Sequence, residues 1–170
     1  MLEMSKAKCR RWEEVLPPGT RIKVLCIGVN ECTAWANLTN AVADAESVAK
    51  QFLELPSSRV RECKNPTTKA FLLREVEKFL RNIDKQSPPE IVVIFFAGHA
   101  IQEGDKIFMF PATADPKDKS ELDKQCLSHD ALFRILKNEL DDKIDVIDVR
   151  YIVILDAWMP VATRLKVRKQ

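Results

Sequence analysis

The chain has 170 residues, of which 46% are hydrophobic and 31% charged, and this composition is typical of one folded domain rather than a disordered chain. The formal net charge of +2 gives no support to a nucleic-acid partner, and no apolar run reaches the ~18 residues that a membrane helix needs. The first 14 residues carry charges without an apolar core, which excludes a signal peptide. We therefore expect neither a nucleic-acid nor a membrane partner.

The five cysteines form an odd set without a CxxC pair: Cys9, Cys26, Cys32, Cys63 and Cys126. This pattern argues against a disulfide framework and against a zinc site, and it favours reduced thiols in the cytoplasm. We expect no metal and no cofactor.

In the first half of the chain, short apolar runs alternate with amphipathic stretches. Residues 22–29 have the pattern of a buried strand, and residues 38–55 carry apolar side chains at helical spacing. Residues 59–64 fit a short strand. A second amphipathic helix follows, for which Thr67 or Thr68 is the expected N-cap.

In the second half, residues 91–96 (IVVIFF) form a continuous apolar run, as in a central parallel strand that is covered on both faces. Residues 106–110 fit a shorter strand. Ser128 is the expected cap of a helix over 130–140, whose Leu132, Phe133, Ile135 and Leu136 should point inward. Residues 151–155 (YIVIL) repeat the buried-strand pattern. This order predicts an α/β fold, a three-layer sandwich with a mostly parallel sheet.

Ligands of open α/β sheets bind beyond the carboxyl ends of the strands. Three segments of this chain answer that description: 30–35, 97–100 and 156–159. His99 should lie there, at a strand end on a glycine-flanked loop, although a lone histidine in such a place is structural as often as catalytic. His129 is expected to be a surface or capping residue.

Three segments resemble the caspase, metacaspase and paracaspase superfamily. FFAGHAIQEGDKIFMFPATADP is similar to its histidine segment, NLTNAVADAESVA to its first helix, and YIVILDA to the strand that delivers the nucleophile. The resemblance covers residues 23–159 and implies a caspase-like, large-subunit domain over 21–160. An N-terminal extension (1–20) and a basic tail (161–170) flank this domain. Since the family fold continues with further strands, we expect the C-terminal part of the fold to be missing.

The resemblance implies a role for each matching residue. A Cys–His pair cleaves peptides because the thiolate attacks the carbonyl while the imidazole manages the protons. His99 matches the general base, and the backbone N–H of Ala100 matches an oxyanion donor. Ala100 replaces a glycine, so a positive φ there would cost ~1 kcal/mol. The nucleophile position falls on Trp158, whose indole offers no nucleophile.

The resemblance also suggests a specificity pocket. Metacaspase-like members use acidic residues to select Arg or Lys, and Asp44 and Asp156 match those positions. The alternative stays open that Asp44 is a solvated helix residue and that Asp156 forms a turn at the end of a strand. The hairpin after His99 lacks the acidic calcium-binding insertion of metacaspases, so no calcium dependence is predicted. In its short hairpin and in the Cys126-Leu127 pair, the chain resembles paracaspases more than metacaspases.

Two functions remain open. The first is a pseudo-peptidase that binds a polypeptide, a caspase-like relative or an adaptor protein in proteolytic signalling. The second is an active cysteine endopeptidase that cleaves after basic residues with a displaced nucleophile, for which Cys32 is a better candidate than Cys126. A nucleotide-binding domain is excluded because no Gly-rich loop follows a strand, and Gly28 alone is no phosphate cradle.

Overall fold

The structure, a computed structural model, describes residues 19–83, 91–141 and 149–158. Most of the N-terminal extension, Cys9 and the basic tail lie outside the described residues. Within the described part, no helix combines the length and the apolar character that a membrane crossing requires.

Six strands form one mixed sheet with the order β2-β1-β3-β4-β5, and β6 pairs with β3. The strands are β1 (Ile22–Gly28), β2 (Ser58–Lys64), β3 (Ile91–Glu103), β4 (Lys106–Met109), β5 (Leu127–Ser128) and β6 (Arg150–Trp158). β1, β2, β3 and β6 are parallel, while β4 and β5 extend the end of β3 as antiparallel strands. The predicted central strand is confirmed, because β3 lies between β1 and β6 and is buried along most of its length.

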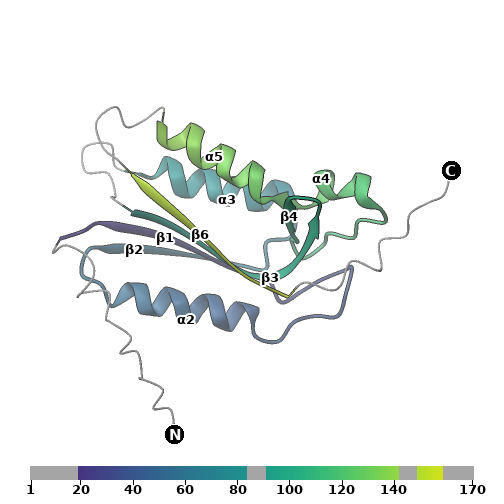
Figure 1. The fold of residues 1–170 in the computed structure, drawn as a ribbon. Coiled ribbons are helices and arrows are strands. Elements are labelled where there is room, and N and C mark those ends of the chain that lie inside the picture. The colour runs from purple at the N-terminus through teal and green to yellow at the C-terminus, as the bar shows by residue number, and fades with distance from the viewer. Residues whose placement is uncertain (1–18, 84–90, 142–148, 159–170) are drawn as a thin grey trace, which may run out of the picture.

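Helices cover both faces of the sheet, which confirms the three-layer architecture (Figure 1). One face carries α2 (Ala41–Leu53), and the other carries α3 (Lys69–Arg81) and α5 (His129–Asp141). Two short elements, η1 (Lys119–Glu121) and α4 (Leu122–Gln125), precede β5. They were not predicted from the sequence.

The predicted helix caps are present. Thr68 Oγ1 accepts a hydrogen bond from the Phe71 N–H at 3.1 Å at the start of α3. Ser128 Oγ accepts one from the Ala131 N–H at 3.3 Å at the start of α5. Each hydroxyl satisfies a backbone donor that has no partner within its helix, which fixes where the helix begins.

Gly28 has a packing role at the end of β1. A Cβ on this residue would lie 2.6 Å from the Val42 Cα and 2.8 Å from the Ala41 carbonyl oxygen. Real Cβ atoms do not come this close to backbone, so the missing side chain lets the first turn of α2 lie directly on the end of β1. This contact places the N-terminal end of α2 at the carboxyl edge of the sheet.

Three expectations from the sequence are wrong. His99 lies inside β3 and not on a loop, because β3 continues past it and its last four residues pair with β4. Likewise, β6 runs on through Asp156 to Trp158, because its pairing with β3 continues to the His99–Trp158 pair. Phe133, expected to point inward, is 38% exposed, whereas Leu132 of the same helix is buried.

β6 is an edge strand within the described part of the chain, where it pairs only with β3. α2 packs against β1, β2 and β3. The side chains of Ile152 and Ile154 lie beside Val93 and Phe95 on this same face, and both isoleucines are about 40% exposed. The described residues therefore leave one strip of apolar sheet surface uncovered.

Candidate functional site

Three aromatic rings meet at the carboxyl edge of the parallel strands. Trp35 lies in the loop after β1, His99 in β3 and Trp158 at the end of β6. The centroid of the His99 ring is 5.3 Å from that of Trp35 and 5.4 Å from that of Trp158, with the Trp158 ring at 80° to the imidazole. The structure thus brings together the three strand-end segments that the sequence singled out.

The contacts of His99 determine where its lone pair lies. The side chain is only 2% exposed, and its Nε2 is 2.9 Å from the Ala36 carbonyl oxygen. Since a carbonyl can only accept, Nε2 must carry the proton and donate it. The other nitrogen, Nδ1, is buried and has no hydrogen-bond partner among the described residues. In the neutral imidazole, the basic lone pair is therefore on Nδ1.

Two asparagines hold the loop that presents the Ala36 carbonyl. Asn30 Oδ1 accepts a hydrogen bond from the Val42 N–H at 2.9 Å, so Asn30 caps α2 from a distance of 12 residues. The N–H of Asn30 donates in turn to Asn65 Oδ1 at 2.8 Å. Asn65 has a φ of 45°, a left-handed conformation that asparagine tolerates better than most residues. These bonds connect the loop with the start of α2 and the end of β2.

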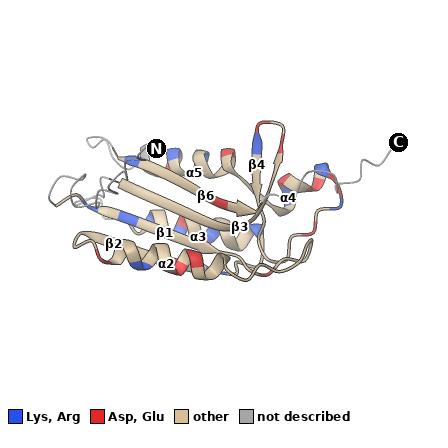
Figure 2. Ribbon diagram, turned by 60° about the horizontal axis from the view of Figure 1, so that its bottom comes forward, with Lys and Arg blue, Asp and Glu red and all other residues tan. Residues whose placement is uncertain are grey.

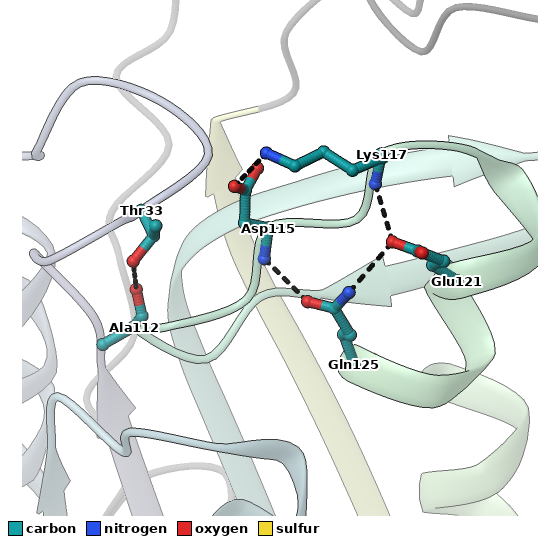
Figure 3. A network of polar contacts seen from close by, with 6 residues as sticks. All are labelled: Thr33, Ala112, Asp115, Lys117, Glu121 and Gln125. Carbon is teal, nitrogen blue, oxygen red and sulfur yellow. Dashed lines mark hydrogen bonds and ion pairs between the residues drawn. The ribbon is translucent and has the colours of Figure 1, made fainter.

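The loop is also fixed to the segment that follows β4. The N–H and Oγ1 of Thr33 both donate to the Ala112 carbonyl oxygen, at 3.0 and 3.2 Å (Figure 3). Further along this segment, the Asp115 N–H donates to Gln125 Oε1 at 2.8 Å, which connects it with α4. The loop after β1, the segment after β4 and α4 are therefore joined around the aromatic cluster.

Ala100 follows His99 in β3 and lies opposite Met109 of β4. The Phe110 N–H donates to the His99 carbonyl oxygen at 3.0 Å, so the Ala100–Met109 pair is of the non-hydrogen-bonded kind. The Ala100 N–H consequently points away from β4, toward the side of β3 on which β6 lies. Among the described residues other than glycine, only Asn65 has a positive φ. Ala100 therefore avoids the strain that a left-handed backbone would have imposed.

Asp44 and Asp156 line one cavity of about 200 Å³ between α2 and the ends of β3 and β6. The cavity is lined by Leu38, Thr39, Asn40, Ala41, Asp44, Ala97, Gly98, Asp156 and Trp158. Figure 2 shows acidic residues (red) on α2 and near the end of β6. Within the described part of the chain, neither carboxylate forms an ion pair. The two residues therefore face one shared space, as their proposed common role requires.

The described cysteines have the properties of core residues. All four are buried: Cys26, Cys32, Cys63 and Cys126. Burial raises the thiol pKa of Cys26 and Cys63 to about 11 and that of Cys126 to about 12. It also raises the pKa of Cys32. Near neutral pH these groups are thiols, and a thiol is a poor nucleophile.

Two further observations concern His129 and possible metal ligands. His129 is half-buried at the start of α5, and its Nδ1 accepts a hydrogen bond from the Ile107 N–H of β4 at 3.0 Å. Among the described residues, no three His, Cys, Asp or Glu side chains come together in a way that could hold a metal ion.

Sequence reasoning missed the groups that orient His99. The Ala36 carbonyl has no sequence signal, since every residue carries a carbonyl. Trp35 was noticed only as the end of a segment. Asn30 and Asn65 had a readable signal, because each asparagine directly follows a predicted strand, where polar side chains often cap the backbone.

The model of the caspase domain family matches residues 21–159. A comparison with proteins of curated function gives no match. Among solved structures, a protein from Geobacter sulfurreducens is similar, with a TM-score of 0.54 and 22% identity over 81% of this chain. This similarity shows a shared fold. The matched region is 50% of that protein, so the present chain spans about half of its length.

Proposed function

Because the chain belongs to the caspase domain family, we propose that it is a catalytically inactive member that binds polypeptides in the cleft beside His99. A basic side chain of the bound polypeptide occupies the cavity between Asp44 and Asp156. In this function the chain acts as a binding module in proteolytic signalling, and a caspase-like relative or an adaptor protein supplies the polypeptide.

One observation carries this proposal: Trp158 pairs with His99 across β3 and β6, in the place where the family resemblance puts the nucleophile. His99 Nδ1 has a lone pair that can accept a proton, and the Ala100 N–H points to the side of β3 on which β6 lies. Hydrolysis also needs an atom that attacks the carbonyl carbon. The indole of Trp158 has only an N–H donor and carbon atoms, and it fills the space where a thiolate and a scissile bond would meet.

The alternative, an active peptidase with a displaced nucleophile, has less support. Cys32 is 8% exposed, and burial raises its pKa, so it forms little thiolate at neutral pH. Cys126 is fully buried, and its pKa of about 12 makes it still less reactive.

Binding to a basic side chain is supported by charge. Asp44 and Asp156 are both exposed, both line the cavity, and neither is neutralised by a basic residue of the described chain. The β6 edge offers a second contact, because an extended polypeptide can add a strand to an open sheet edge. The reduced-thiol pattern of the sequence favours a cytoplasmic location for this binding.

The test has a catalytic arm and a binding arm. Fluorogenic peptides that end in Arg, Lys or Asp should all remain uncut, and cleavage of any of them would contradict the proposal. A fluorescein-labelled peptide with one central lysine should bind, as measured by fluorescence anisotropy. Replacing Asp44 and Asp156 together by Asn should weaken this binding about tenfold, the usual effect of losing a charge-assisted hydrogen bond.

Asp105→Asn is the matched control, since Asp105 is an exposed aspartate in the turn between β3 and β4. This change should leave the affinity unaltered. Equal weakening by the control and the double variant would mean that the cavity is not the binding site.

A further inference from the structure

Trp158 does more in this structure than occupy the place of a nucleophile. Its side chain is 58% exposed, the largest exposed fraction of any described tryptophan, and it lines the same cavity as Asp44 and Asp156. The backbone that carries it is held in the sheet by the pairing of β6 with β3. On one side its ring contacts His99 at 80°, in the edge-to-face arrangement that aromatic pairs favour. The indole is therefore a supported aromatic surface at an acidic cavity.

An aromatic face and a carboxylate attract the same kind of ligand by different means. The face of an indole carries negative charge from its quadrupole and attracts a cation within about 6 Å without requiring a hydrogen bond. A carboxylate attracts the cation by charge and accepts its N–H bonds. A cavity with both groups can bind a cation that has lost some of its N–H donors.

We propose that Trp158 is a cation–π platform, and that the cavity binds N-methylated lysine, with dimethyl-lysine as the best ligand. This inference rests on the proposed binding of a basic side chain. Dimethylation keeps the positive charge and leaves one N–H, which donates to Asp44 or Asp156. The two methyl groups pack against the indole and lower the cost of removing the cation from water.

The size of the cavity agrees with this ligand. Its volume of about 200 Å³ is many times the roughly 10–15 Å³ that a single water needs, so a small cationic group has room to enter. The part of dimethyl-lysine beyond Cα has seven heavy atoms: four methylene carbons, the nitrogen and two methyl carbons. The acidic residues lie on α2 and β6, and the indole lies two residues beyond Asp156 on the same face of β6. A side chain that enters the cavity is thus offered both kinds of contact.

A carboxylate pocket without an aromatic platform would behave in the opposite way. Each added methyl group removes an N–H donor, so dimethyl-lysine and trimethyl-lysine would bind more weakly than lysine. The order of affinities along the methylation series therefore separates the two kinds of pocket.

The experiment titrates one peptide that carries lysine, dimethyl-lysine, trimethyl-lysine or acetyl-lysine at the same central position. Binding is measured by isothermal titration calorimetry with the full chain and with Trp158→Leu and Trp158→Phe. The full chain is expected to bind dimethyl-lysine about 3- to 10-fold more tightly than lysine, and acetyl-lysine, which is neutral, more weakly than either. Trp158→Leu should abolish or reverse the preference for dimethyl-lysine, and Trp158→Phe should retain part of it.

Thermal unfolding of each variant shows whether it is folded, and the preference is a ratio of affinities within one variant, so partial loss of folded protein does not alter it. If the full chain bound dimethyl-lysine no more tightly than lysine, the proposal that Trp158 is a cation–π platform would be wrong. If lysine still bound and the Asp44→Asn, Asp156→Asn variant weakened it, the proposed function would stand without the platform. If no peptide of the series bound, both proposals would fail.

Discussion

A thiol introduced at position 158 should report directly on the lone pair of His99. Trp158 pairs with His99 across β3 and β6, their rings are 5.4 Å apart, and Nδ1 has no hydrogen-bond partner in the described part of the chain. Protonation at Nδ1 gives an imidazolium, because Nε2 already donates to the Ala36 carbonyl. We expect this imidazolium to stabilise a thiolate in the Trp158→Cys variant.

The expected size of the thiol pKa shift follows from the direct pairing of residues 99 and 158 on neighbouring strands. An opposite charge within about 4–6 Å lowers a pKa by roughly 1–3 units, so a thiol with an ordinary pKa of about 8.5 should titrate at about 5.5–7.5. The native thiols do not obscure this signal. All four described cysteines are buried, and burial raises the pKa of Cys26 and Cys63 to about 11 and that of Cys126 to about 12. Burial also raises the pKa of Cys32.

The measurement is the rate of iodoacetamide labelling at the introduced thiol between pH 5 and 10, followed by peptide mass spectrometry. Cys9 is outside the described residues and is replaced by serine in every variant. The matched control adds His99→Ala, which removes the imidazole and should return the midpoint to about 8.5. A midpoint that is the same with and without His99 would refute the reasoning, because the imidazole would then not lie beside position 158 in solution.

Three further predictions concern stability in urea. Gly28→Ala should lower the free energy of unfolding by about 1–3 kcal/mol, because the Cβ of the new alanine would lie 2.6 Å from the Val42 Cα. An unchanged midpoint of urea unfolding would contradict this prediction. Thr68→Ala should cost about 1 kcal/mol by removing the acceptor of the Phe71 N–H, whereas Thr68→Ser should cost little. Burial and two neighbouring arginines lower the pKa of Lys23 from 10.5 to about 8, so between these values the unfolded chain binds more protons. Stability should therefore rise as pH increases from 8 to 10.5, and Lys23→Met should flatten this rise.

The sequence was sufficient to predict which segments meet at the carboxyl edge of the sheet. The order of apolar runs and amphipathic stretches predicts a mostly parallel sheet, and the carboxyl ends of parallel strands share one edge. Segments 30–35, 97–100 and 156–159 were expected at that edge, and the cluster of Trp35, His99 and Trp158 confirms that they meet.

The sequence was less informative about where strands end. β3 and β6 extend beyond their predicted boundaries, so His99 and Asp156 lie within strands rather than loops. The extension depends on pairing partners, since His99 lies opposite Trp158 and Ala100 opposite Met109. Apolar periodicity reports which residues are buried, but it contains no information on whether a neighbouring strand continues beside them.

The sequence by itself determined that an indole stands where the resemblance places a nucleophile, and that His99 matches the histidine of the family. Only the tertiary structure decided that the Ala36 carbonyl fixes the proton on Nε2, that Cys32 is buried, and that Asp44 and Asp156 line one cavity. The physical reason is that residue types and periodicity are local properties of the chain. A hydrogen bond between residues 63 positions apart, or a cavity between a helix and two strands, depends instead on strand register and on how closely the helix packs.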